Sequence, residues 1–379
     1  MREKKEKLTE LNAASGLQVD RRTFMGGLAA ATGVAAFTIT PGKAKAADWP
    51  TQPITLVVMY SAGGGTDTVL RTLAGEMAKS KGWNINVINK PGAVGAVATE
   101  FVAGKEGDGH WLLGAANYNK FVRVMGHTDV KPWEEWTYFQ AANAVASWAV
   151  PTDSPFKTFD DVVAAAKKDP GKLTISTSGT GGIWHELALI VADAADIRLS
   201  FVPYKGGKPA ALAGLQGETD IAGGGVHEHI ELIRAGKLRC LQQTSAEDIK
   251  LADGTVLPTV GKMLPELKSL LPIGPQYNLV MKRDIPVPVL KELKEAFVAA
   301  VKSDAFEKIA KSKYFTVDIR TGDAADRRAA QLEALTASTF KKYSDQIKGN
   351  VKSPEELGLP EPKDFDKWWP PQGYKPIDI

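Results

Sequence analysis

The sequence predicts an α/β protein with a largely parallel sheet, because short apolar runs alternate with helical segments along most of the chain. The first run, 54–60, is rich in β-branched residues and leads through a glycine-rich turn into a helical stretch over 68–81. A second cycle of the same kind begins near Pro151. The chain has 379 residues, of which 44% are hydrophobic. This is enough for about two domains with substantial cores.

The first cycle continues with further short apolar runs, each separated from the next by a helical stretch or a turn. They predict strands over 85–88, 111–115 and 144–150. Runs of this length between turn residues are typical of buried strands. Strands that alternate with helices form βαβ units, so the first cycle predicts one α/β domain.

The second cycle repeats the pattern. Its helices are expected over 159–168, 185–193 and 208–216, and its strands over 174–176, 199–202, 220–222 and 238–242. The proline-punctuated stretch 257–275 would return the chain to the first domain. Two long amphipathic helices, 290–302 and 323–347, would complete that domain. The tail from Pro354 is expected to be extended and docked by its tryptophans, Trp368 and Trp369.

The first 46 residues have the layout of an export signal. A charged start runs into Arg21-Arg22-Thr23-Phe24-Met25, which resembles the twin-arginine motif, and the weakly apolar stretch 26–39 that follows has 14 residues, too few to span a bilayer. Ala44-Lys45-Ala46 fits a small-x-small cleavage site. The alternative, an amphipathic helix of a cytoplasmic protein, would show helical periodicity instead of a Gly/Ala block. We therefore expect cleavage near Ala46 and a periplasmic mature protein without a lipid anchor.

Charge and cysteine content exclude several classes of function. Lys and Arg total 47 against 44 Asp and Glu, a net charge of +3 with no run of like charge, so we expect no nucleic-acid partner. Without residues 1–46 the counts become 39 and 40, a net charge of −1. Cys240 is the single cysteine, which excludes an internal disulfide and a thiolate metal cluster. After the leader no stretch reaches the ~18 apolar residues of a membrane span, so we expect a soluble mature protein.

Three glycine-rich turns precede helices and predict anion binding. They are Gly63-Gly64-Gly65-Thr66, Gly92-Ala93-Val94-Gly95 and the turn from Ser178 to Gly182. A helix amino end offers unpaired N–H groups and a positive dipole end to an anion. Each turn alone has an equally good alternative, because glycine also permits a tight strand-to-helix turn. Two turns in the first cycle and one in the second favour an anion held between two lobes.

None of these turns fits a nucleotide motif. The first lacks the lysine of a phosphate loop, and no G-x-G-x-x-G opens a helix with an acidic residue placed for a ribose. Asp67 in the first turn would also repel a phosphate. We favour Asp67 as the N-cap of the following helix, where its carboxylate would accept backbone N–H groups.

Spaced motifs stand in a fixed order between about Trp49 and Pro288. They are Pro53-Ile54 with 63–67, then 89–95, 108–110, 170–173, 178–181 with His185, 202–207, 217–220 and 235–239. In this order they resemble the tripartite tricarboxylate transporter receptors, also called Bug proteins. The resemblance implies a type II periplasmic binding protein with two α/β lobes and a ligand cleft between them. Lobe one would comprise 47–146 plus 272–379, and lobe two 147–271.

The resemblance also implies a function and a site. Such a receptor would capture a small carboxylate by lobe closure and deliver it to the membrane permease subunits of the transporter. The residues that correspond to the ligand-binding turns of the family are Ser61, Ala62, Gly63, Gly64, Thr66, Asp67, Ala93, Val94, Ser178, Thr180, Gly181, Tyr204 and Asp220. The body of the solute would be selected by side chains such as Tyr118, Trp184 and Tyr204.

Some positions depart from the family pattern. Ala62 stands where proline is usual, Trp184 where a small polar residue is usual, and Asn117-Tyr118 in a tract that commonly holds Ser and Thr. We include Asn117, Tyr118 and Trp184 among the expected ligand-binding residues. An aromatic ring at a pocket rim could stack on a flat carboxylate. For Trp184, packing beneath the lobe is an equally good alternative.

No enzyme chemistry has support in the sequence. His227 and His229 lack a third ligand at metal spacing, His185 suits a structural hydrogen bond, and no G-x-S-x-G elbow occurs. We therefore expect no metal, cofactor or catalytic residue, and a monomer. Two alternatives remain: a receptor that presents its ligand to a sensor kinase, and a cofactor-containing enzyme, because the twin-arginine route exports folded proteins. Di- and tricarboxylates and aromatic acids all remain candidate solutes.

Overall fold

The computed structural model describes residues 49–347 and 349–379. The expected export signal, 1–46, lies outside the described residues. Residues 45–379 cluster into one compact unit. Within the described part of the chain, no helix combines the length and apolar character that a membrane span requires.

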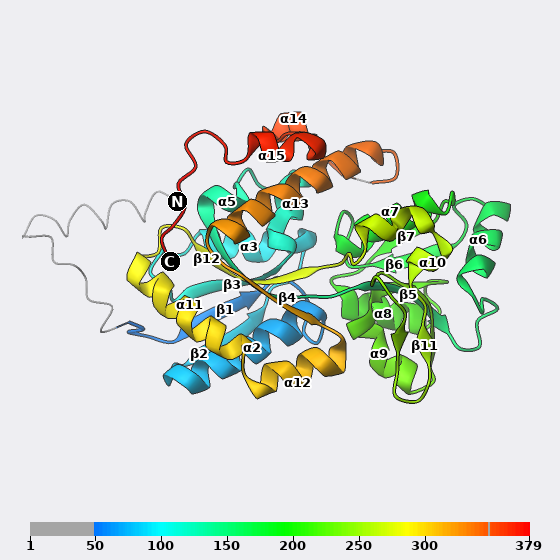
Figure 1. Cartoon of the computed structure of the whole chain (residues 1–379), viewed down its shortest axis with the longest axis horizontal. Helices are drawn as coiled ribbons and strands as arrows, with labels where there is room; N and C mark the ends of the chain where they lie inside the picture. The colour runs from blue at the N-terminus through cyan, green and yellow to red at the C-terminus, as the bar shows by residue number, and fades with distance from the viewer. Residues whose placement is uncertain (1–48, 348) are drawn as a thin grey trace, which may run out of the picture. The chain divides into compact units, whose positions relative to one another are not determined.

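A six-stranded sheet forms the centre of lobe one (Figure 1). Its order is β13-β4-β12-β3-β1-β2, with the bounds β1 Ile54–Val58, β2 Ile85–Asn89, β3 Trp111–Ala116, β4 Trp136–Asn143, β12 Gln276–Lys282 and β13 Thr316–Arg320. Strands β2 and β3 pair in parallel with β1, whereas β12 pairs antiparallel with β3 and β4, and β13 antiparallel with β4. The expectation of a largely parallel sheet is therefore wrong beyond the first three strands.

Helices cover both faces of this sheet. The long helices α2, Gly65–Lys81, and α11, Val287–Val301, pack against each other on one face, and α13, Asp323–Lys342, lies on the other (Figure 1). The remaining helices of this lobe are α3 Ala96–Ala103, α4 Lys120–Val124, α5 Pro132–Glu135 and α12 Asp304–Lys313. Helix α2 ends where Gly82 adopts the left-handed conformation and donates its N–H to Ala78. The core beneath these helices includes Leu56, Leu70 and Phe297.

Lobe two contains smaller sheets. Strands β8, Ala222–Gly225, and β9, Leu238–Gln243, pair antiparallel with β5, Ala146–Pro151, while β6, Thr174–Thr177, and β7, Ser200–Pro203, pair in parallel. A short hairpin joins β10, Ile249–Lys250, to β11, Val256–Leu257. The helices of this lobe are α6 Phe159–Lys168, α7 Ile183–Ala194, α8 Gly207–Leu215, α9 Val226–Arg234 and α10 Val260–Met263. The predicted α/β class with two lobes is thus confirmed.

The chain crosses between the lobes through segments that lie side by side. Ala144 follows β4, and its N–H donates to the Pro275 carbonyl at 2.9 Å. Gly274 lies just before β12, and a β-carbon added there would be 2.0 Å from the Ala144 carbonyl oxygen. Only glycine fits at this position without a shift of the backbone.

The C-terminal tail is docked but only partly extended. It contains two short helices, α14, Pro354–Leu357, and α15, Phe365–Trp368. The Trp368 ring lies edge-on against Trp133, with centroids 6.0 Å apart. These aromatic residues belong to an apolar cluster that also includes Leu187 of α7 and Phe340 of α13, so it joins both lobes.

Candidate functional site

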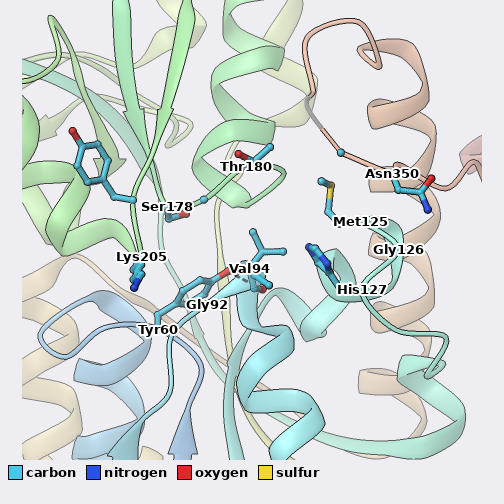
Figure 2. A pocket seen from close by; sticks show the side chains of 14 residues that line it. Tyr60, Gly92, Val94, Met125, Gly126, His127, Ser178, Thr180, Lys205 and Asn350 are labelled. Carbon is cyan, nitrogen blue, oxygen red and sulfur yellow. Dashed lines mark hydrogen bonds between the residues drawn. The ribbon is translucent and has the colours of Figure 1, made fainter.

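A cavity of about 400 Å³ opens where loops of the two lobes meet (Figure 2). Lobe one and the segment after α13 contribute Tyr60, Gly92, Ala93, Val94, Met125, Gly126, His127, Gly349 and Asn350. Lobe two contributes Ser178, Gly179, Thr180, Tyr204 and Lys205. A volume of this size suits a small organic molecule.

The lobe-one wall is a strained turn after β2. Ala93 and Val94 have φ values of 43° and 47°, although neither is glycine. The turn is flanked by Gly92 and Gly95, also at positive φ, and the Tyr60 hydroxyl donates to the Val94 carbonyl at 3.4 Å. Left-handed backbone at non-glycine residues costs free energy and persists where the surrounding structure imposes it. The turn therefore holds Ala93 and Val94 at the cavity in a fixed shape.

The lobe-two wall is the turn between β6 and α7. The Gly181 N–H donates to His185 Nδ1 at 3.0 Å, and the Gly182 N–H donates to the Gly179 carbonyl. Burial lowers the pKa of His185 to about 4, which keeps its ring neutral and able to accept this bond. His185 is thus structural, as its sequence context suggested.

Donors for a solute remain in this turn. Ser178 is 4% exposed, and its Oγ has no hydrogen-bond partner in the described structure. The N–H groups of Gly179 and Thr180 likewise have no partner among the described residues. Buried polar groups are normally paired, and an unpaired one at a cavity indicates a missing partner. The turn is therefore equipped to bind an acceptor such as a carboxylate.

The charges around this cavity of about 400 Å³ favour an anion. Among the described residues that line it there is no Asp or Glu, and Lys205 contributes an ammonium that forms no salt bridge within the described chain. Lys205 and His127 lie on opposite sides of the cavity in Figure 2. Tyr204 also lines the cavity, with its hydroxyl donating to Glu218 at 2.8 Å.

A second, smaller space of about 20 Å³ lies next to the first, because Tyr60 and Ser178 line both. Its other walls include Gly64, Thr66, Trp184, Glu228 and Tyr277. This volume holds about one water molecule. Trp184 is buried at this junction, with its ring 6.0 Å from His227.

The first glycine turn is engaged in other contacts. The Ser61 hydroxyl donates to the Lys205 carbonyl at 3.0 Å and so connects the two lobes. Asp67 is the third residue of α2 and not its N-cap, which is Gly64. The Asp67 carboxylate accepts the Gly63 N–H and forms an ion pair with Arg71, with the closest N···O distance 2.6 Å. It therefore supports the turn, as expected, but from a different helix position.

Several expected site residues lie away from both cavities. Tyr118 is fully buried and donates its hydroxyl to Gln140 at 2.7 Å, because residues 117–119 all adopt left-handed backbone and turn its ring into the core. Asn117 is also buried and lines neither cavity. Asp220 accepts the Thr174 N–H at the start of β6, whereas Ser178 follows the end of that strand.

The remaining expected residues divide clearly. Ala93, Val94, Ser178, Thr180 and Tyr204 line the larger cavity, while Gly64, Thr66 and Trp184 line the smaller one with Ser178. The residues that line neither are Ser61, Ala62, Gly63, Asp67, Asn117, Tyr118, Gly181 and Asp220.

Other lining residues were missed in the sequence. Met125 is wedged between the lobes: a β-carbon on Gly181 would lie 2.2 Å from its Sδ, and one on Gly349 would lie 2.8 Å from its Cε. Met125 and Asn350 are far from any motif, so no local signal marks them. Lys205 did stand within a motif of the resemblance, 202–207, and its exposed charge could have marked it.

A buried ion pair also joins the lobes near the site. Lys120 at the start of α4 lies 2.9 Å from Glu186 of α7, and both side chains are almost fully buried. Thr336 of α13 donates its hydroxyl to the same carboxylate. Helices of both lobes thus meet at one charged cluster.

Comparisons with known proteins agree on one class. The model of the family described as "Tripartite tricarboxylate transporter family receptor" matches residues 69–347. An Agrobacterium vitis protein described as "UPF0065 protein in the TAR-I ttuE-ttuC' intergenic region" is 31% identical over 271 residues, which cover 70% of this chain and 76% of that protein.

Solved structures show the same fold. The periplasmic binding protein BugD superimposes with a TM-score of 0.71 at 23% identity, over 80% of this chain and 100% of that one. MatC from Rhodopseudomonas palustris, solved with bound malate, superimposes with a TM-score of 0.65 at 22% identity, over 79% of this chain and 100% of that one. The matching family is one of transporter receptors, so the enzyme alternative is set aside.

Proposed function

The chain belongs to the tripartite tricarboxylate transporter receptor family, and from this premise we propose that it captures a small organic carboxylate in its larger cavity and delivers it to a membrane permease. In this proposal the protein acts as a monomer in the periplasm, after export through a twin-arginine signal and cleavage near Ala46. Lobe one comprises 47–146 plus 272–379, and lobe two 147–271. Lobe closure, not covalent chemistry, performs the function.

The observation that carries the proposal is the donor set of the larger cavity. Ser178 Oγ and the N–H groups of Gly179 and Thr180 have no partners among the described residues, and Lys205 supplies a positive charge. A carboxylate bound there would satisfy these donors and pair with the ammonium. The malate-bound structure of a protein with this fold supports the same class of solute.

Within this class we favour a short dicarboxylate over an aromatic acid. Lys205 and His127 lie on opposite sides of the cavity and offer a basic group to each end of such a solute (Figure 2). Trp184, the aromatic residue expected to stack on a flat solute, is instead buried beside the smaller space.

The test is calorimetric titration of the purified protein with linear dicarboxylates, tricarboxylates and aromatic acids. We expect saturable binding of at least one dicarboxylate. A ligand at ~100 times its dissociation constant should also add about 2.7 kcal/mol of stability. If no carboxylic acid binds or shifts the thermal transition after any retained ligand has been removed by unfolding and refolding, the proposal is wrong.

A further inference from the structure

The proposed function leaves a buried carboxylate unused. Glu228 is 7% exposed and lines the smaller space, where Ser178 is also found. It is the third residue of α9, and its Oε2 accepts the Gly225 N–H at 3.0 Å. This bond closes the amino end of α9 in the manner of a capping box.

The same carboxylate also faces the amino ends of two other helices. A β-carbon added to Gly207, the first residue of α8, would lie 1.8 Å from Glu228 Oε1. One added to Gly64, the N-cap of α2, would lie 3.6 Å from the same oxygen. Helix amino ends attract negative charge. Glu228 of lobe two thus provides an anion to α2 of lobe one.

Glu228 carries this charge without a lysine or arginine partner among the described residues. Burial raises the pKa of Glu228, but His227 and the Gly225 N–H outweigh it and hold the pKa below its usual value. His227 Nε2 lies 3.6 Å from Glu228 Oε1 and 3.1 Å from the Tyr277 hydroxyl. The carboxyl group is therefore ionised at neutral pH.

This arrangement changes the role expected for the first glycine turn. The resemblance implied that a solute carboxylate binds at the amino end of α2. In the structure, the carboxylate of Glu228 lies there instead. Two like charges 4 Å apart repel by about 1–4 kcal/mol at effective dielectric constants of 80 to 20. The space of about 20 Å³ also admits little more than one small group.

Ser178 connects this space to the larger cavity. Ser178, whose buried Oγ has no partner in the described structure, lines both, so a solute held by the Ser178 turn can extend a small substituent toward Glu228. The substituent that fits beside a carboxylate is a hydrogen-bond donor, and a cationic donor gains most.

Resting on the proposed function, we infer that Glu228 is a specificity-determining residue that makes the smaller space a subsite for an ammonium group, so that the protein prefers an amino-substituted carboxylate to the unsubstituted acid of the same skeleton. The carboxylate groups of this solute bind in the larger cavity, and the amino group lies between Ser178 and Glu228. Ligand selection then depends on a charge supplied by lobe two.

The test uses acids that share a skeleton and differ only at the second carbon. Calorimetry on the purified protein would compare succinate, malate and aspartate, and then the corresponding acids with five and six carbons. In the series that binds, we expect the amino acid to bind at least about tenfold more tightly than the unsubstituted acid. Glu228→Gln keeps the shape of the side chain and removes its charge. It should reduce the ratio of the affinities for the amino acid and the unsubstituted acid to about threefold or less.

The matched control is Glu231→Gln. It makes the same change one turn later on α9, where the side chain is exposed and paired with Lys313, and it should leave the ratio unchanged.

An unsubstituted acid that binds the wild-type protein as tightly as its amino counterpart overturns the inference and leaves the proposed function intact. An unchanged ratio in folded Glu228→Gln overturns it as well. If Glu228→Gln does not fold, the ratio of the wild-type affinities for the amino-substituted and unsubstituted acids decides whether the inference holds. Failure of every acid in all series, and in the wider carboxylate panel, counts against the proposed function itself.

Discussion

Lys120 and Glu186 form a buried ion pair across the two lobes, with Nζ 2.9 Å from Oε2. Lys120 belongs to α4 of lobe one, and Glu186 lies in the first turn of α7, directly after the turn that carries Ser178. Burial lowers the pKa of Lys120, while the Glu186 charge opposes this effect. The pair therefore couples the position of the anion-binding turn to lobe one.

Removal of one partner of this pair should destabilise the protein strongly. Lys120→Met would leave Glu186 buried without a counter-charge, at a cost of about 3–5 kcal/mol in the free energy of unfolding, measured by urea denaturation. The control Lys131→Met removes an exposed pair with Glu134 and should cost less than about 1 kcal/mol. Equal losses in the two variants would show that the buried pair has no special role.

Ser178→Ala combined with Thr180→Ala should weaken carboxylate binding at least about tenfold, because it removes hydroxyls that line the cavity. Ser178 Oγ has no protein partner in the described structure, so folding should lose little. Ser176→Ala is the control: its buried Oγ donates to the Ala210 carbonyl and accepts the Gly223 N–H, and its loss should cost about 1–3 kcal/mol of stability with affinity retained. Calorimetry and thermal melting separate the two effects. Unchanged affinity in the double variant would disprove this site assignment.

Gly181→Ala should impair both folding and binding. Its φ is +71°, and the new β-carbon would lie 2.2 Å from Met125 Sδ. We expect a loss of about 2–4 kcal/mol from backbone strain and overpacking. Gly217→Ala controls for the backbone part, because Gly217 has φ +76° with no atom within 4 Å of the added carbon. If the two variants have equal stability in urea denaturation, the contact between Met125 and Gly181 is not tight.

His185 should make stability depend on pH. Its folded pKa of about 4 lies below the value of about 6.5 for an unfolded histidine. The stabilisation from its neutral ring is therefore complete above pH 6.5 and decreases as the pH falls toward 4, by about 3 kcal/mol. Urea unfolding at a series of pH values should show a smaller decrease for His185→Asn, which can still accept the Gly181 N–H. The control is His127→Asn, at an exposed position, which should show the same dependence of stability on pH as the wild type. If stability depends on pH in His185→Asn as it does in the wild type, His185 is not the source of this dependence.

Local patterns in the sequence predicted the parts of the fold and site that depend on local chemistry. The turn from Ser178 to Gly182 lies between a strand and a helix as expected, because its glycines and hydroxyls act within a few residues of one another. The long helix α2 was predicted over 68–81 and begins only three residues earlier, at Gly65. The expected strand 144–150 corresponds to β5, Ala146–Pro151, whereas β4, Trp136–Asn143, was missed.

The other differences arise from tertiary contacts. Tyr118 was expected at a rim, but three consecutive left-handed residues turn it into the core, and its main-chain N–H donates to Asn278, 160 residues away. Glu228 reaches the smaller space because its carboxylate lies against the amino ends of α2 and α8. Met125 and Asn350 meet through chain segments more than 200 residues apart. Periodicity and motif spacing carry no information on such encounters.

The close approach of Gly274 to Ala144 has a consequence for how an opening motion would be observed. The two crossing segments are joined by a hydrogen bond, and at Gly274 their backbones are too close for a side chain. We therefore expect these segments to act as the hinge of a relative motion of the lobes. One pair of spectroscopic labels, one on each lobe, would follow this motion, and the distance between the labels should change as solute is added.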